Sequence, residues 1–174
     1  MDLARGVQQQ IEAMGQPAAA YPLDVLDLGN IRNTVDRVTS EFGRLDILVN
    51  NAGIRIRRPS LEVTEADWDD VIDVNLKALF FTCQAFAKAA LADGRAAKII
   101  NIASLLSFQG GIRVPSYTAS KHGVAGLTKL MANEWAARRV NVNAIAPGYI
   151  ETANTEALRA DEDCNAAILE RIPA

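Results

Sequence analysis

The chain has 174 residues, of which 49% are hydrophobic and 22% are charged, with a net charge of −3. This length and composition suit one soluble globular domain with a sizeable core. Because acidic residues outnumber basic ones by 21 to 18, we expect neither nucleic acid nor an anionic membrane as a partner.

The cysteine and histidine content argues against a disulfide-stabilised protein and against a metal-binding protein. Cys83 and Cys164 lie far apart and outside any CxxC motif, so we expect no disulfide framework. The single histidine, His122, has no ligand-like neighbours, so we expect no metal site. The start of the chain lacks a signal-peptide core, and no run of about 18 apolar residues occurs. A reducing cytoplasm fits these features best.

The predicted elements alternate between helix and strand from the beginning. Apolar residues at helical spacing predict a helix over 3–14, and "AAAYPLDVLDL" then predicts a strand running to about Leu26. Asn30 is the predicted N-cap of a second helix, which Gly43 ends. The apolar, β-branched run "LDILVN" (45–50) predicts a strand buried on both faces.

A long helix follows a loop that carries the basic run "RIRR". Thr64 and Asp67 form a capping-box-like start, and the helix is predicted to end near Gly94. Its predicted inward residues are Trp68, Val71, Ile72, Leu76, Leu79, Phe80 and Cys83.

The last third repeats the alternation. A buried strand at 97–103 leads into a Gly-containing loop, and Pro115 opens a helix that carries apolar residues to Trp135. A strand at 140–146 and a polar helix over 155–172 complete the chain. This order predicts one α/β domain over 1–174, a doubly wound, Rossmann-like fold with a parallel sheet.

Polar or turn-forming residues follow three of the predicted strands. They are Asn50 and Asn51 after the second strand, Ser104 after the third, and Pro147-Gly148 after the fourth. Ligands of doubly wound folds bind outside the carboxyl ends of the strands. We therefore expect a binding site at this edge of the sheet.

Tyr117 and Lys121 lie four residues apart in "SYTASKHG" and so share one face of the predicted helix. An ammonium beside a phenol favours the phenolate and lowers the phenol pKa from about 10 toward neutrality. The pair could therefore supply a general acid or base. The alternative is an amphipathic Tyr and a solvated Lys on a surface helix.

Asn75 and Ser104 are further candidates with ordinary alternatives. Asn75 interrupts an apolar helix, where a buried amide either satisfies backbone groups or organises a water. The hydroxyl of Ser104 could hold a substrate oxygen near Tyr117, although serines are common at strand ends.

"NNAG", Asn75 in "VN", Ser104, "YTASK" and "PG", in this order and spacing, resemble the short-chain dehydrogenase/reductase family from about residue 20 onward. Three stretches, "LLSFQGGIRVPSYTASKHG", "LMANEWA" and "NAIAPGYIETANTEALRAD", are more similar still to its sugar-acid dehydrogenases. Those enzymes are of the 2-deoxy-D-gluconate 3-dehydrogenase and 2-dehydro-3-deoxy-D-gluconate 5-dehydrogenase type.

The resemblance implies roles for the candidate residues. Tyr117 would exchange a proton with the substrate hydroxyl, Lys121 would lower its pKa and bind the nicotinamide ribose, Ser104 would orient the substrate, and Asn75 would hold a relay water. The implied cofactor is NAD, with NADP left open. Its implied contacts are Asp27, Leu28, Asn51, Ala52, Gly53, Tyr117, Lys121, Pro147, Gly148, Ile150 and Thr152.

The resemblance also implies a homotetramer assembled through the helices 65–93 and 116–138. In one respect the sequence departs from the family, because its eleven glycines form neither TGxxxGxG nor GxGxxG. We therefore expect a partial domain that lacks the first βαβ unit, with its phosphate-binding turn, and the C-terminal strand. Its sheet should have exposed apolar edges.

Three hypotheses follow. The first is an NAD(P)-dependent oxidoreductase acting on a sugar acid, with Arg113 as a candidate partner of the substrate carboxylate. The second keeps the chemistry and changes the substrate, as in a 3-oxoacyl-carrier-protein reductase or a gluconate 5-dehydrogenase. The third is a catalytically inactive α/β module that only binds a partner.

Overall fold

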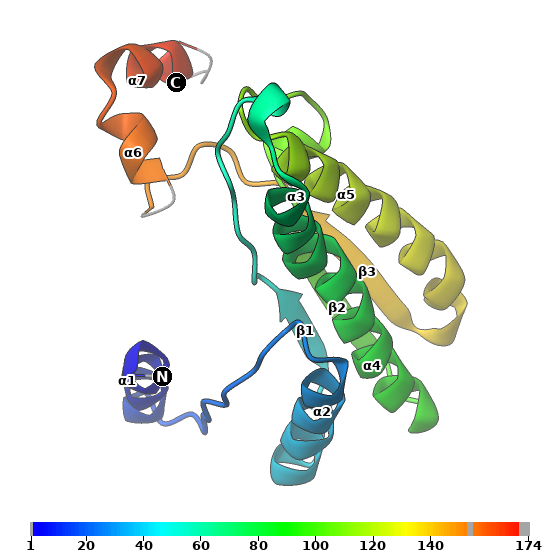
Figure 1. Cartoon of the computed structure of the whole chain (residues 1–174). Helices are drawn as coiled ribbons and strands as arrows, with labels where there is room; N and C mark the ends of the chain where they lie inside the picture. The colour runs from blue at the N-terminus through cyan, green and yellow to red at the C-terminus, as the bar shows by residue number, and fades with distance from the viewer. Residues whose placement is uncertain (1, 153–154, 171–174) are drawn as a thin grey trace.

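The structure is a computed structural model that describes residues 2–152 and 155–170. Its centre is a parallel sheet with the strand order β1-β2-β3. The strands are β1 (Ile47–Asn50), β2 (Ala97–Ile102) and β3 (Val140–Ile145). Parallel strands need crossover connections, and helices provide both of them (Figure 1). The predicted α/β class with a parallel sheet is confirmed.

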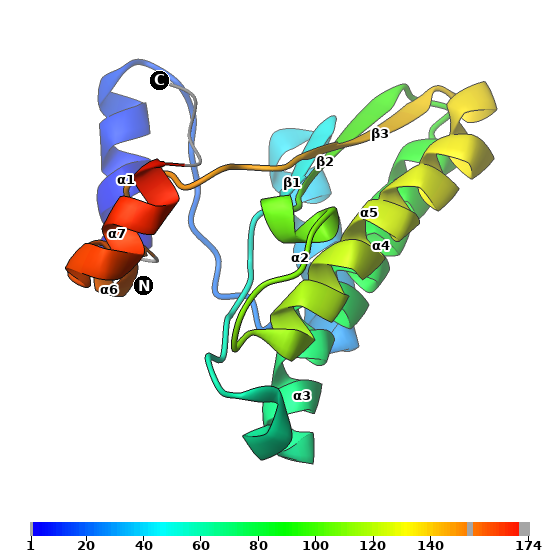
Figure 2. The same cartoon turned by 90° about the horizontal axis from the view of Figure 1, so that it is seen from above.

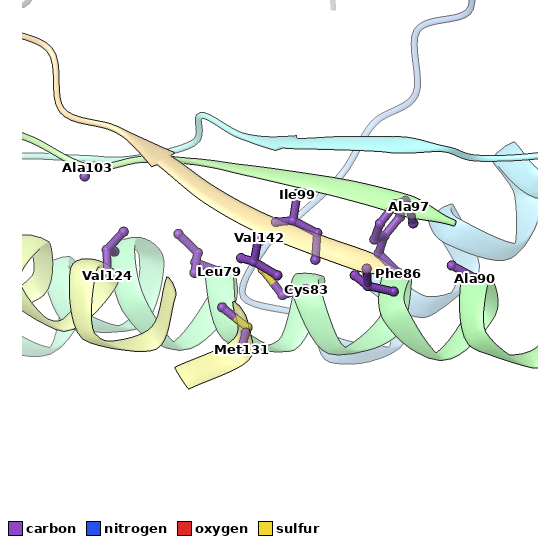
Figure 3. Close-up of a cluster of buried hydrophobic side chains, with 11 residues drawn as sticks. Leu79, Cys83, Phe86, Ala90, Ala97, Ile99, Ala103, Val124, Met131 and Val142 are labelled. Atoms are coloured by element: carbon purple, nitrogen blue, oxygen red, sulfur yellow. The ribbon is translucent and has the colours of Figure 1, made fainter. Parts of the chain in front are cut away.

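Helices α4 (Ala78–Ala92) and α5 (Pro115–Trp135) cover one face of this sheet (Figures 1 and 2). The core lies between them and the strands, as Figure 3 shows. Its fully buried members include Cys83 and Phe86 from α4, Ile99 from β2, and Val124 and Met131 from α5. The sequence predicts this face of α5 correctly.

The long helix predicted from Thr64 is interrupted once. Thr64 and Asp67 form the predicted capping box at the start of α3 (Glu65–Ile72). A π-helical turn (Asp73–Lys77) then joins α3 to α4, and the extra residue per turn shifts the buried face around the axis. This turn contains Asn75. The prediction that Trp68 faces inward is wrong, because 41% of its surface is exposed.

Two helices precede β1. Helix α1 (Asp2–Ala13) begins and ends one residue before the predicted bounds and contains no buried residue. Helix α2 (Leu28–Phe42) packs against α4 and ends, as predicted, at Gly43, whose φ is +75°. Its predicted N-cap is wrong, because Asp27 caps the helix instead of Asn30.

The strand predicted in "AAAYPLDVLDL" does not form, and the described structure has no regular element between α1 and α2. A strand requires a neighbour that satisfies its backbone N–H and C=O groups. Among the described residues this segment has no such neighbour, because β1 pairs only with β2. Apolar composition alone therefore did not fix the conformation.

The second face of the sheet is uncovered, so the prediction of full burial for "LDILVN" is also wrong. We call the side chains of Ile47, Val49, Ile100, Ile102 and Ile145 on this side the open face. Ile47 exposes 57% of its surface, and Val49 and Ile145 each expose 53%. Helices α1, α6 and α7 stand on this side but away from the strands (Figure 2).

The polar helix predicted over 155–172 is instead two short helices, α6 (Glu156–Arg159) and α7 (Glu162–Leu169). The predicted end at Ile172 lies outside the described residues. Within the described ranges, no helix is both long and apolar enough to cross a membrane.

Candidate active site

The three strands end at one edge of the sheet, and the predicted site residues gather there. Asn51 follows β1, Ser104 follows β2, and Pro147 follows β3 (Figure 1). The predicted convergence of strand ends is therefore present.

Tyr117 and Lys121 lie in the first two turns of α5, which begins with Pro115 at a helix-compatible position. The Lys121 Nζ lies 5.6 Å from the centre of the Tyr117 ring. Tyr117 is half-buried, whereas Lys121 is only 6% exposed. Burial lowers the pKa of Lys121, because removing water penalises the ammonium.

The ammonium of Lys121 takes the place of a missing strand neighbour. Lys98 N–H donates to the Asp46 carbonyl, so the even-numbered residues of β2 direct their backbone groups toward β1. The Ile102 carbonyl points the same way, but β1 has ended at Asn50. Lys121 Nζ donates to this carbonyl over 2.6 Å. The sheet edge thus fixes the lysine beneath the site.

Asn75 is buried in the π-helical turn, where it clamps the loop that follows β1. Its Oδ1 accepts from Ile54 N–H (2.8 Å), and its Nδ2 donates to the Ile54 carbonyl (2.9 Å). Nδ2 also donates to Ser120 Oγ (3.2 Å). Both amide hydrogens are therefore used, while Oδ1 keeps one lone pair.

Gly53 brings this loop close to the Asn75–Lys121 pair. A Cβ at this position would lie 3.2 Å from Asn75 Oδ1 and 4.0 Å from Lys121 Nζ. Asn51, Ala52 and Gly53 are exposed at the mouth of the site. A side chain at position 53 would therefore press on the Asn75 amide, which favours glycine there.

Ser104 occupies the turn after β2. Its Oγ accepts from Leu106 N–H (3.2 Å), and its own N–H donates to Ser107 Oγ (3.3 Å). The hydroxyl therefore acts as an acceptor in the turn and retains its hydrogen for another group.

Two buried serines, Ser107 and Ser120, were missed by the sequence reasoning. Ser107 Oγ donates to the Lys121 carbonyl (2.7 Å), and Ser120 Oγ donates to the Tyr117 carbonyl (2.7 Å). A signal was present, since Ser107 follows Ser104 at capping-box spacing and Ser120 lies inside "YTASK".

A buried polar network beneath the site was also missed. Asn50 Nδ2 donates to Asn101 Oδ1 (2.9 Å) and approaches Cys83 Sγ (3.1 Å). Asn101 Nδ2 donates to Thr128 Oγ1 (3.0 Å). The network links β1 and β2 to α4 and α5 through groups that are otherwise costly to bury.

Arg113 and Asp27, which were also predicted as site residues, form hydrogen bonds with other parts of the chain. Arg113 is exposed with a φ of +61°, and its carbonyl accepts from Arg58 N–H (2.8 Å). Asp27 Oδ1 accepts from the N–H groups of Gly29 and Asn30 (2.8 and 3.1 Å) and so acts as the cap of α2, in which Leu28 is the first residue.

The segment after β3 is a short, exposed loop. Gly148, Ile150 and Thr152 are exposed, and Pro147 is half-buried. Thr155 Oγ1 donates to the Ile150 carbonyl (2.8 Å), which ties the loop to the start of α6.

A separate hollow of the described surface lies away from these residues. It has a volume of about 290 Å³, lies between α2 and α4, and includes Leu28, Arg32, Phe81 and Lys88 in its lining. Neither Tyr117 nor Asn75, Ser104 or Lys121 lines it, so the chemistry of the chain points to the strand ends.

Comparison with known proteins identifies the family of the chain and several relatives. Residues 2–163 match the sequence pattern of the short chain dehydrogenase family. The 2-dehydro-3-deoxy-D-gluconate 5-dehydrogenase of Escherichia coli is 57% identical over 166 residues, which cover 95% of this chain and 66% of that enzyme.

Two solved structures are also similar. One, from Agrobacterium tumefaciens with bound NADP, is provisionally assigned as a 2-deoxy-D-gluconate 3-dehydrogenase. It is 63% identical with a TM-score of 0.90, over 98% of this chain and 67% of that one. The other is a gluconate 5-dehydrogenase from Burkholderia cenocepacia in complex with NADP and tartrate. It is 35% identical with a TM-score of 0.92, over 97% of this chain and 66% of that one.

The chain thus spans about two thirds of the length of these relatives. The family pattern covers nearly all of it. The chain belongs to the short-chain dehydrogenase family.

Proposed function

We propose that the protein is an NAD(P)-dependent oxidoreductase that interconverts a secondary hydroxyl and a ketone on a sugar acid of the 2-dehydro-3-deoxygluconate or 2-deoxygluconate type. The observation that carries the proposal is the buried Lys121 ammonium, held 5.6 Å from the Tyr117 ring at the carboxyl edge of the sheet. Its close relatives are named for substrates of this type.

Tyr117 is the proposed acid and base. Its phenol exchanges a proton with the substrate oxygen, and the Lys121 ammonium stabilises negative charge on the phenol oxygen while that proton is away. Ser104 donates its free hydroxyl hydrogen to the substrate oxygen. The remaining lone pair of Asn75 Oδ1 accepts a hydrogen from a water, which can then serve as a proton relay toward Lys121.

The residues present fit the nicotinamide and ribose end of the cofactor. An ammonium has three N–H donors, and Lys121 Nζ uses one of them for the Ile102 carbonyl, so donors remain for ribose hydroxyls. The loop Asn51–Gly53 carries no bulky side chain at its closest approach, and Pro147, Gly148, Ile150 and Thr152 border the same edge. A bound nicotinamide supplies the hydride chemistry.

The contacts of Asp27 and Leu28 with adenine remain predictions. So does the choice between the two dinucleotides, because the sugar-acid resemblance favours NAD whereas the two solved relatives hold NADP. Arg113 remains the proposed partner of the substrate carboxylate. Its backbone bond to Arg58 joins the two loops beside the site.

The test begins with the intact mass of the expressed protein and the reduction of NAD and NADP in the presence of 2-dehydro-3-deoxygluconate. Turnover should fall by roughly 10²- to 10⁴-fold in Tyr117→Phe. Tyr21→Phe is a matched control, because the Tyr21 hydroxyl donates to Glu41 near the end of α2. Equal turnover of the wild type and Tyr117→Phe would contradict the proposed role of Tyr117.

The same assay separates the alternatives. Faster turnover of gluconate, or of a 3-oxoacyl thioester, would favour the second hypothesis and leave the site chemistry unchanged. Neither dinucleotide binding nor turnover, in a protein of 18.8 kDa, would favour the inactive binding module.

The homotetramer, the cytoplasmic location and the single domain over 1–174 also remain predictions. Light scattering coupled to size exclusion would test the tetramer, since α4 and α5 should each contact a partner if the assembly follows the resemblance. A monomeric mass across the assay concentrations would contradict it.

A further inference from the structure

Ser107 sits at the junction of the two chain segments that carry the proposed chemistry. It ends a 3-10 turn (Leu105–Ser107) that begins directly after Ser104, and only 5% of its surface is exposed. Its hydroxyl donates to the Lys121 carbonyl over 2.7 Å and accepts from Ser104 N–H over 3.3 Å. One oxygen atom therefore bridges the serine turn and α5.

Two hydrogen-bonded links join these segments, because Lys121 Nζ also donates to the Ile102 carbonyl at the end of β2. The serine turn follows β2, whereas the first turns of α5 are fastened through Ser120 to Asn75. Ser107 makes the hydrogen bonds that connect the backbone of Ser104 directly to the backbone of Lys121. Of these two links, the one made by Ser107 reaches the backbone of Ser104 itself, so it bears directly on the distance between the Ser104 hydroxyl and the Tyr117–Lys121 pair.

We infer that Ser107 is a positioning residue that sets the spacing between Ser104 and the Tyr117–Lys121 pair. The inference rests on the proposed function and adds a residue to which no role has been assigned. The Ser107 hydroxyl is engaged with protein backbone and has no proposed contact with substrate or cofactor. It acts by holding the turn against the helix, because a small misplacement of reacting groups is costly to rate.

The expected effect separates positioning from general destabilisation. Loss of the hydroxyl in Ser107→Ala leaves the Asn75–Ser120 fastening intact, so cofactor affinity should remain unchanged. The turn would loosen relative to α5, and kcat should fall about three- to tenfold, which is the range that one lost hydrogen bond supports. The pH profile should keep its shape, because no titrating group is altered.

The experiment compares the wild type, Ser107→Ala, Ser107→Thr and the control Ser40→Ala, which removes an exposed hydroxyl from α2. Steady-state kinetics, dinucleotide Kd and Tm are measured for each, together with residue-resolved amide hydrogen exchange. Ser107→Ala should accelerate exchange at the Ser104 amide, and Ser107→Thr should restore part of kcat because it keeps the hydroxyl.

Each outcome is decisive. A reduced kcat with unchanged cofactor Kd and faster Ser104 exchange supports the inference. Unchanged exchange in Ser107→Ala, or faster exchange with unchanged kcat, overturns it while the proposed function stands. A wild-type protein without turnover overturns the proposed function first, and the inference falls with it.

Discussion

At the scale of single residues, Lys121 does two things with one ammonium. It ends the hydrogen-bond ladder of β2 at Ile102 and lies beside the Tyr117 ring. Because burial lowers its pKa, the folded protein binds this proton less tightly than the unfolded chain does. Its contribution to stability is therefore least favourable below the lowered pKa and improves as the pH rises toward 10.5.

Asn75 gives a sharper prediction, because its amide satisfies three partners at once. Asn75→Ala leaves the N–H and carbonyl of Ile54 and the Ser120 hydroxyl without this partner. We expect a loss of about 2–4 kcal/mol in the free energy of unfolding, measured by urea titration. Asn33→Ala, on the exposed side of α2, is the control and should cost under about 1 kcal/mol. Equal losses would contradict the clamp.

The buried thiol of Cys83 should react slowly with alkylating reagents. Its pKa is raised to about 12, chiefly because burial penalises the thiolate. In a Cys164→Ser background, iodoacetamide at pH 8 should modify Cys83 only through unfolding, since the thiolate fraction is about 10⁻⁴. Fast modification without denaturant would show that the thiol is accessible.

The raised pKa of Cys83 also makes the stability of the folded state depend on pH in a defined direction. A raised thiol pKa stabilises the folded state fully below the unfolded value of 9.0, and this contribution is lost as the pH rises from 9.0 toward about 12. Between pH 9.0 and 10.5 the contributions of Cys83 and Lys121 to stability therefore change in opposite directions.

At the scale of elements, two substitutions can test which residue is the N-cap of α2. Asp27→Ala removes the oxygen that accepts from the N–H groups of Gly29 and Asn30, so it should cost about 1 kcal/mol of stability. Asn30→Ala removes only the acceptor of Asp24 N–H and should cost less. Thermal unfolding of the two variants decides between the observed cap and the one expected from sequence.

Elements whose signals are local were predictable. The capping box at Thr64, the end of α2 at Gly43 and the apolar face of α5 depend on residues within a few positions of one another. The wrong predictions concern features that depend on residues distant in sequence. The segment 18–26 lacks a strand neighbour, and the π-helical turn contains Asn75, whose partner Ile54 lies 21 residues earlier in the chain.

The residues of the candidate site likewise separate into those that local sequence predicts and those that it does not. Tyr117 and Lys121 were predictable, because helical spacing alone puts them on one face. The bridges from Ser107 and Ser120 were not, because each joins backbone groups whose separation only the tertiary fold determines. Arg113 could not be placed from sequence, since a loop with a φ of +61° follows no periodic rule.

At the scale of the whole molecule, the surface is larger than its mass requires. The accessible area is 11,022 Å², against roughly 8,300 Å² expected for a compact protein of 18.8 kDa. The open face contributes large apolar side chains to this excess, and an uncovered apolar sheet favours association.

Substitution on the open face should therefore reduce association without unfolding the protein. Val49→Lys together with Ile145→Lys should lower ANS fluorescence and the concentration dependence of the sedimentation coefficient, because both side chains are 53% exposed. Ile99→Lys is the contrasting variant and should unfold the core, since Ile99 is fully buried. Unchanged association in the double variant would place the contact elsewhere.

The parallel register has a consequence for how the chain folds. Ile47 pairs with Lys98, and Ala97 pairs with Val140, so each strand pair must close a loop of more than forty residues. Closure of such a loop costs on the order of 3 kcal/mol in chain entropy before any sheet contact forms. The α5 helix can nucleate early from local contacts, whereas the strand edge that holds Lys121 assembles late. Tyr117 and Lys121 should therefore share one helix face early, whereas the bond that anchors Lys121 to the Ile102 carbonyl should form only in the final stage of folding.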